Sequence, residues 1–234
     1  MLTPELREKA KELIGRYPLP RSALLPLLHL VQAQDGYVTD DGIAECAELL
    51  GLTKAEVQAV STFYTMYKRD PLGRHLVSVC TNFSCKVRGG QEVYDRLSQR
   101  LGVGHNETTP DGAITLEHAE CLGNCDGAPV VTVDYLNYEC VSPEKAVELV
   151  ERISAGEVPP PTRGIIPPGV RDIEYRVAGL GPRQADEPGA MPHQARASDG
   201  AVPAPDAGPG ITPTYLDARR SRRDVEHEEL TRNA

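Results

Sequence analysis

Apolar residues recur every three to four positions along the first seventy residues, which predicts four short helices joined by tight turns. The first helix begins after Thr3, and a capping box formed by Thr53 and Glu56 opens the fourth. The second, from about Arg21 to Gln34, is apolar around most of its circumference and is therefore predicted to be buried. The third follows Thr39, and the first three helices end at Gly15, Gly36 and Gly51. The pattern predicts a small helical bundle over residues 1–70.

Beyond the sequence Asp70-Pro-Leu-Gly73 the period of the apolar positions shortens to two, which is typical of β-strands. The predicted elements are, in order, a strand at 75–79, a helix after Gly90 that ends at Gly102, a strand from Ile114, a strand at 130–133, a turn around Asn137, a short strand into Val141 and a helix that follows Ser142. This βαβββα order predicts an α+β domain over residues 71–157.

The chain loses its apolar periodicity from Gly156 onward, where twelve of the twenty prolines lie. Such a segment buries too little apolar surface to offset the entropy of ordering it. Residues 158–234 are therefore predicted to be a Pro- and Ala-rich tail that is mostly disordered. Its few apolar side chains, within 156–180, are predicted to lie along a partner.

Composition narrows the range of functions. The formal charge of −9 over 234 residues argues against nucleic-acid binding, since a phosphate partner requires a basic face. No apolar run is long enough to span a bilayer, and the charged start is typical of a helix and not of a signal peptide. The sequence predicts a cytoplasmic protein, in which cysteines bind metal or stay reduced.

Four cysteines fall as two pairs, a C-x4-C pair and a C-x3-C pair: Cys80 with Cys85, and Cys121 with Cys125. This spacing lets each loop turn back so that both of its sulfurs reach one metal ion, and a [2Fe–2S] cluster requires two thiolates on each of two irons. From spacing alone a structural zinc ion fits about equally well. A thioredoxin-type redox disulfide requires C-x-x-C, which is absent.

With these motifs, and with FYTMYKRDPLGRHLVSVC before the first pair and CLGNCDGAP around the second, the chain resembles the 24 kDa [2Fe–2S] subunits of respiratory complex I, also called its E subunits. The resemblance covers residues 1–157. It implies a thioredoxin-like [2Fe–2S] ferredoxin domain behind the helical bundle, with Cys80, Cys85, Cys121 and Cys125 as the cluster ligands. Similar subunits belong to NAD-linked hydrogenases and formate dehydrogenases, which remain alternatives, as does a zinc-stabilised interaction module.

The resemblance also implies a function and partners. The cluster would exchange single electrons with FMN in an adjoining NADH-oxidising subunit, on a complex whose large multi-cluster iron–sulfur subunit lies nearby. The chain itself has no convincing dinucleotide fingerprint, so FMN and NADH are expected in the partner only, with no quinone site here. The expected location is peripheral, on the cytoplasmic face of the inner membrane. An acidic chain with only Lys86 and Arg88 close to the ligands in sequence favours a low reduction potential.

Four further side chains of ligand type are predicted to be structural, because the paired cysteines already supply four ligands: Cys46, Cys140, His29 and His118. The first two are expected to be packed thiols. Tyr64 and Tyr67 are expected between the bundle and the cluster domain, or facing a partner. Pro129 is a candidate for a cis peptide bond, although trans is the default expectation.

Overall fold

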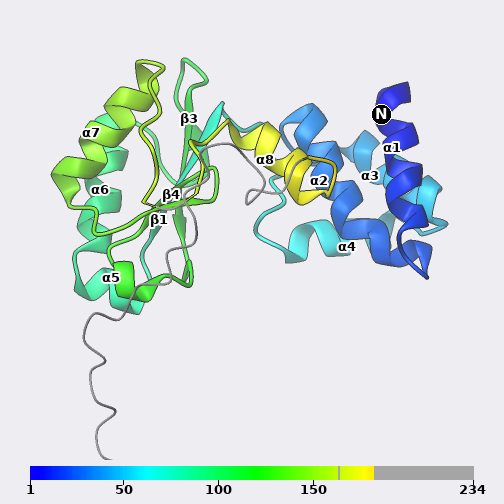
Figure 1. The fold of residues 1–234 in the computed structure, drawn as a ribbon, viewed down its shortest axis with the longest axis horizontal. Coiled ribbons are helices and arrows are strands. Elements are labelled where there is room, and N and C mark those ends of the chain that lie inside the picture. Colours follow the sequence, from blue (N-terminus) through cyan, green and yellow to red (C-terminus); the bar gives the residue numbers. More distant parts are fainter. Residues whose placement is uncertain (163, 182–234) are drawn as a thin grey trace, which may run out of the picture. The chain divides into compact units, whose positions relative to one another are not determined.

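A computed structural model of the chain describes residues 1–162 and 164–181. The helical bundle contains α1 (Pro4–Gly15), the 3-10 helix η1 (Pro20–Ala23), α2 (Leu24–Asp35), α3 (Asp40–Leu50) and α4 (Lys54–Phe63) (Figure 1). The predicted caps are present. Thr3 and Thr39 accept hydrogen bonds from backbone amides, and Thr53 and Glu56 form the capping box. The four predicted helices are therefore confirmed.

Helix α2 is the central element of the bundle. As predicted, apolar residues on most sides of α2 are buried: Leu24, Leu27, Leu28, Leu30 and Val31. They form one core with the inner faces of α1, α3 and α4. Gly36 ends the helix with φ +83°, a left-handed conformation that glycine adopts without steric cost.

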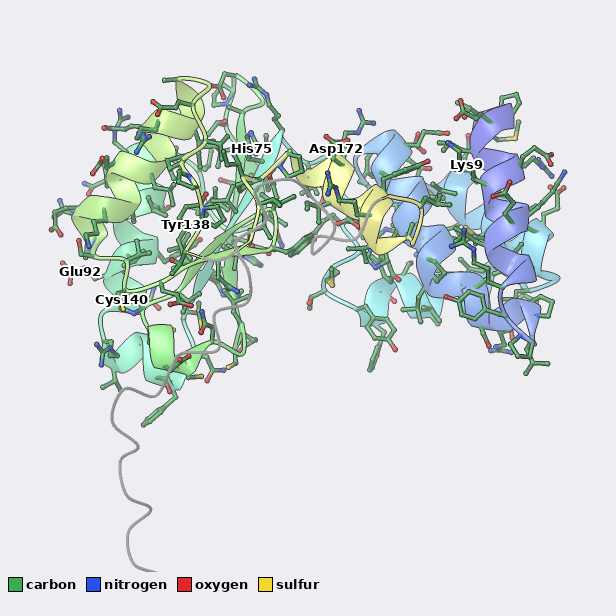
Figure 2. The ribbon with its side chains drawn as sticks, viewed as in Figure 1. Lys9, His75, Glu92, Tyr138, Cys140 and Asp172 are labelled. Atoms are coloured by element: carbon green, nitrogen blue, oxygen red, sulfur yellow. The ribbon has the colours of Figure 1, made fainter. Side chains whose placement is uncertain are left out.

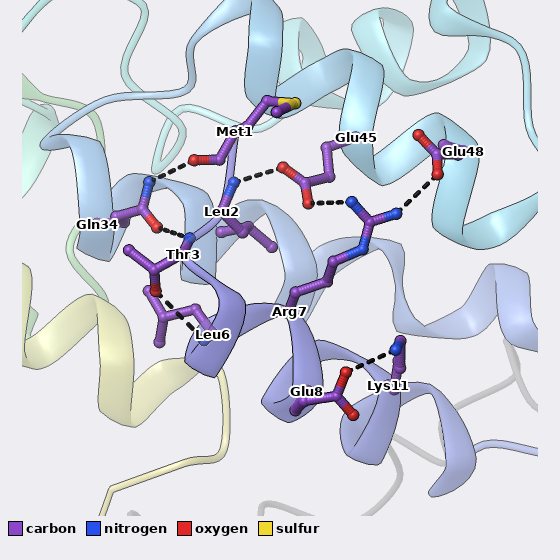
Figure 3. A network of polar contacts seen from close by, with 10 residues as sticks. All are labelled: Met1, Leu2, Thr3, Leu6, Arg7, Glu8, Lys11, Gln34, Glu45 and Glu48. Atoms are coloured by element: carbon purple, nitrogen blue, oxygen red, sulfur yellow. Dashed lines mark hydrogen bonds and ion pairs between the residues drawn. The ribbon is translucent and has the colours of Figure 1, made fainter.

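The first residues of the chain are bonded to this bundle (Figure 3). The buried carboxylate of Glu45, on α3, accepts hydrogen bonds from the backbone N–H of Leu2 and from the guanidinium of Arg7. Gln34, on α2, accepts from the backbone N–H of Thr3 and donates to the carbonyl of Met1. The two donors to Glu45 satisfy its buried charge, because a buried carboxylate requires hydrogen-bond partners.

The second half of the chain forms a mixed five-stranded sheet, in the order β2-β3-β1-β4-β5. Its elements are β1 (His75–Cys80), α5 (Phe83–Val87), α6 (Gly90–Leu101), β2 (Glu107–Thr108), β3 (Ile114–Ala119), η2 (Cys125–Gly127), β4 (Val131–Val133), β5 (Leu136–Tyr138) and α7 (Pro143–Ser154). The central strand β1 pairs in parallel with β3, and the other pairings are antiparallel. The predicted order is confirmed, with β2 and α5 added.

Helices α6 and α7 pack side by side on one face of the sheet (Figure 1). Alternate residues of the strands point into this layer and form the core of the domain with both helices, including Val77, Val79, Ile114, Leu116, Leu97 and Ile153. The residues of opposite parity in β1 and β3 are more polar, and the loop that joins the bundle to the sheet contacts them. Lys68 bonds Glu117, and the N–H of Gly73 donates to Thr115 Oγ1.

The turn predicted around Asn137 is wrong by two to three residues. The chain turns at Asp134 and Tyr135, which have φ values of +50° and +65°, and Asn137 lies in β5 opposite Thr132. A two-residue hairpin turn with both residues at positive φ is usually built from Asn and Gly, so this sequence carries little local signal for it. Asp134 is instead held by tertiary contacts: its buried carboxylate accepts from His75 Nδ1 and from the N–H of Leu76.

The segment after Gly156 also departs from the prediction. Helix α8 (Val170–Val177) packs against α2, and Ala178 belongs to the core of the bundle. Helix α8 and the residues up to Leu180 therefore pack against this chain's own helices, where we expected a mostly disordered tail whose few apolar side chains lie along a partner. The rest of the predicted tail, 182–234, lies outside the described residues. No helix in the described part of the chain is long and apolar enough to cross a membrane.

Candidate metal centre

The four paired cysteines lie at the ends of two neighbouring parallel strands or in the short segments that follow them. Cys80 is the last residue of β1 and is in register with Ala119, the last residue of β3. Cys85 lies on α5 directly after β1, and Cys121 follows β3 by two residues. Because the carboxyl ends of parallel neighbours meet at one edge of a sheet, the two cysteine loops are brought together there.

The thiols form two pairs. The sulfurs of Cys121 and Cys125 are 3.7 Å apart, and both residues are exposed. Cys80 and Cys85 lie in one buried cluster and are only 3% and 2% exposed. Cys125 interacts electrostatically with Cys80 and Cys85, so the two pairs are neighbours. Within residues 1–162 and 164–181, no three His, Cys, Asp or Glu side chains converge on a point suited to a single metal ion.

The protonation of these thiols is shifted by their surroundings. Burial, followed by the neighbouring Cys80, raises the pKa of the Cys85 thiol to about 11, while an N–H from Val130 opposes the shift. The adjacent Cys121 raises the pKa of Cys125. Burial is the main cause at Cys85 and the adjacent Cys121 is the main cause at Cys125, and both disfavour the thiolate form. A cationic metal centre removes that penalty, because a coordinating thiol is deprotonated outright. The donor set therefore fits a thiolate-bound metal cluster.

The buried pair is enclosed by backbone and apolar side chains. Ala128, Val130 and the half-buried Leu122 pack around Cys80 and Cys85. The N–H of Cys80 donates to the carbonyl of Val130, 3.0 Å away. This enclosure limits the access of water to one pair of thiols.

The peptide bond between Ala128 and Pro129 is cis, so the default expectation of trans is wrong at this position. The carbonyl of Ala128 accepts a hydrogen bond from Arg88 Nε, which ties the two cysteine loops together. The sequence identifies Arg88 only as a positive charge near the cysteines. The contact with Ala128 gives Arg88 a structural role as well.

Glycines make the close approach of these loops possible. A Cβ at Gly90 would lie 2.6 Å from the carbonyl oxygen of Cys80 and 2.9 Å from that of Cys85, closer than any real contact. Gly123, between the exposed cysteines, has φ +78°, and a Cβ at Gly127 would overlap Glu139. Gly90 therefore holds α6 against both buried ligand candidates, a role that its sequence position at the start of a predicted helix did not reveal.

The two remaining cysteines differ from each other. Cys46 is fully buried in the bundle, as predicted, and burial raises its pKa to about 12. The prediction of a packed thiol is wrong for Cys140, which is exposed (Figure 2). The strand ends at Tyr138 and does not extend into Val141. The backbone then adopts φ +51° at Cys140, whose N–H donates to Gly127.

The other candidate side chains lie away from the four thiols. His29 is buried in the bundle, whereas His118 is exposed and stacks on His105, with 4.1 Å between ring centroids. Tyr64 and Tyr67 line a cleft of about 460 Å³ between the α4 end of the bundle and β3. This agrees with the prediction that they lie between the bundle and the cluster domain. None of the four paired cysteines lines this cleft.

A mixed sheet covered by helices, with two pairs of thiols on loops at one edge, defines an α+β metal-binding domain of the thioredoxin-like class. The family model of the thioredoxin-like [2Fe-2S] ferredoxins matches residues 10–154, and the chain belongs to this family.

Curated relatives agree in name. The chain is 53% identical over 182 residues to the E subunit of NADH-quinone oxidoreductase from Mycobacterium tuberculosis, covering 78% of this chain and 72% of the relative. It is 39% identical over 150 residues to subunit 2 of the NADH-quinone oxidoreductase from Thermus thermophilus, covering 63% and 83%.

Among solved structures, an NAD+-reducing [NiFe]-hydrogenase in the H2-reduced state matches with a TM-score of 0.50 and 19% identity. The match covers 57% of this chain and 22% of the hydrogenase chain. At this identity the likeness shows a shared fold.

Proposed function

We propose that this chain is the electron-transfer subunit of an NADH:quinone oxidoreductase and that it holds one [2Fe–2S] cluster on Cys80, Cys85, Cys121 and Cys125. The observation that carries the proposal is the arrangement of these thiols as two adjacent pairs at one edge of the sheet. Two pairs match the ligand requirement of two bridged irons. The names of the relatives support the enzyme class.

The bound cluster would supply reversible one-electron transfer, and the residues of the chain would hold it and tune its potential. Four thiolates, two sulfides and two ferric ions carry a formal charge of about −2, so adding an electron is electrostatically unfavourable. The Val130 N–H stabilises negative charge at Cys85, and the apolar enclosure around the buried pair opposes it. With a net charge of −9 on the chain, we expect a low reduction potential.

The proposal extends to partners. NADH and FMN would bind in an adjoining flavin-bearing subunit, with a large multi-cluster iron–sulfur subunit nearby. The assembly would be peripheral, on the cytoplasmic face of the inner membrane. Residues 1–70 would dock the cluster domain of residues 71–157 against the flavin subunit. Exposed aromatic rings support a docking role for the bundle: Phe63 is 77% and Tyr64 45% exposed at the end of α4, and the two rings pack edge to face.

Metal analysis and visible spectroscopy of the purified chain test the cofactor. A [2Fe–2S] protein contains two irons and two sulfides per chain, absorbs visible light and gives a paramagnetic resonance signal on reduction. A colourless protein with one zinc per chain would contradict the proposal and support an interaction module. Subunits that co-purify from the native source decide the enzyme, because complex I, a hydrogenase and a formate dehydrogenase bring different large subunits.

The docking role is tested by Phe63→Ser combined with Tyr64→Ser. We expect this double variant to keep its cluster and to lose co-purification with the flavin subunit. The matched control is Leu19→Ser, because Leu19 is 67% exposed elsewhere in the bundle. Equal recovery of the flavin subunit with the double variant and with the control would contradict docking through the end of α4.

A further inference from the structure

Helix α8 contacts both the bundle and the cluster domain, although it follows the last element of the cluster domain in sequence. Figure 1 shows α8 beside α2, and Ala178 joins the core of the bundle. On the bundle side, Tyr175 accepts a hydrogen bond from Lys9 on α1, and Arg16 donates to the carbonyl of Gly179. On the cluster-domain side, the N–H of Val170 donates to the carbonyl of Arg74, 3.0 Å away, at the start of β1.

One buried carboxylate connects the two sides. Glu174 is fully buried on α8. One of its oxygens bonds Nδ1 of His29 on α2, and the other accepts from the hydroxyl of Tyr135, 3.1 Å away, in the turn between β4 and β5. A buried carboxylate requires donors on both oxygens, and here one donor comes from the bundle and the other from the cluster domain.

The conformation of Tyr135 is unusual for its residue type. Its φ of +65° lies in the left-handed region, which bulky side chains rarely adopt. Burial, followed by the charge of Glu174, raises the pKa of Tyr135 far above its ordinary value, so the hydroxyl stays protonated and remains a donor. The tertiary contact with Glu174 stabilises a turn conformation that the local sequence does not favour.

The linker before β1 also joins the bundle to the cluster domain. There, Lys68 bonds Glu117 on β3, and Glu117 also accepts from Ser78 Oγ on β1, 2.6 Å away. A single attachment through a linker leaves rotation about that linker possible. A second attachment at a different point removes this freedom, and α8 supplies it.

We propose that residues 164–181 form an intramolecular strap that locks the helical bundle onto the cluster domain, with Glu174 as the positioning residue that bonds both. The family match covers residues 10–154 and ends before this segment begins. The proposal does not rest on the redox role, because every contact that carries it lies between protein groups.

Hydrogen exchange followed by mass spectrometry on the purified full-length chain tests the strap. Tyr135→Phe removes the bond from the cluster domain to Glu174 and leaves the bond to His29. We expect up to about tenfold faster exchange both in α8 and in the turn around Tyr135, since a hydrogen bond to a charged group is lost. Tyr175→Phe is the matched control, because it removes a contact between α8 and α1 alone. It should speed exchange in α8 and leave the turn unchanged.

Glu174→Ala and Glu174→Gln complete the series. Alanine removes both bonds and should speed exchange in α2, in α8 and in the turn. Glutamine keeps the size of the side chain and two polar atoms and should restore much of the protection. Unchanged exchange of α8 in Tyr135→Phe would overturn the strap and leave α8 as part of the bundle alone. So would an effect of Glu174→Ala that is confined to α2 and α8. The Tyr135→Phe result decides the question if the alanine variant does not fold.

Discussion

The two cysteine loops offer the same number of thiols to a metal but are built differently. The loop after β1 buries Cys80 and Cys85 under Ala128 and Val130, with α6 pressed against it through Gly90. The loop after β3 leaves Cys121 and Cys125 exposed. The difference indicates that one side of the centre is preformed by packing while the other forms the face open to solvent or to a partner.

Of the changes proposed here, loss of a cysteine ligand should have the largest effect on the metal centre. We expect Ser at any of the four positions, Cys80, Cys85, Cys121 or Cys125, to abolish or severely weaken the cluster, because an alkoxide is a poor substitute for a thiolate. Iron content and the paramagnetic resonance signal of the reduced protein measure the loss.

Ser at Cys46 or Cys140 is the control for these variants and should leave the cluster intact. A normal cluster in Cys121→Ser would show that the exposed pair is not part of the ligand set. The buried pair alone would then have to be completed by other groups.

Gly90→Ala tests whether packing preforms the buried side. The added methyl group would overlap the carbonyls of Cys80 and Cys85, so we expect a loss of about 1–3 kcal/mol in the free energy of unfolding, together with reduced iron retention. Chemical denaturation and iron analysis measure both. Gly15→Ala is the matched control, since nothing lies within 4 Å of a Cβ there. Equal stability of the two variants would mean that the loop shifts to accept the methyl group.

Alkylation of the metal-free chain compares the accessibility of the thiols directly. We expect Cys121, Cys125 and Cys140 to react quickly, Cys80 and Cys85 slowly, and Cys46 only on unfolding, in the order of their exposure. Peptide mapping by mass spectrometry at successive times gives the rate at each position. Similar rates at Cys85 and Cys125 would show that the buried side is open without metal.

The smallest effect is expected in the pH dependence of the metal-free chain. The folded pKa of Cys85 is about 11 against an ordinary value of 9.0, so above pH 9 the unfolded chain loses a proton that the folded chain keeps. Stability is therefore fully present below pH 9 and falls as the pH rises toward 11. Denaturation midpoints between pH 8 and 11 should fall less steeply in Cys85→Ala than in the unsubstituted chain. Cys125→Ala, at the exposed side, should change the slope less.

Features that depend on nearby residues could be predicted from the sequence. The helices of the bundle begin at Thr3, Thr39 and Thr53 and the first three end at glycine, because capping is satisfied within a few residues. The spacing of the cysteines likewise identified the four candidate ligands, since two sulfurs on one short loop can reach one metal ion.

Features that depend on distant contacts could not be predicted in this way. The turn at Asp134 and Tyr135 has no local glycine and is held by His75 and Glu174, which are far away in sequence. Cys140 was expected to be packed because the strand was extended too far.

By itself the sequence determined the positions of the helices, the change from bundle to sheet and the pairing of the cysteines, because these follow from local periodicity, capping and spacing. The tertiary structure alone decided which thiol pair is buried and which is exposed, and that α8 and the residues up to Leu180 pack against the bundle. Burial is a property of the contacts that a segment makes with the whole fold. A short amphipathic helix such as α8, preceded by prolines and glycines, has too few apolar residues for the sequence to predict what it packs against. It is ordered by its contacts with α2 and Tyr135.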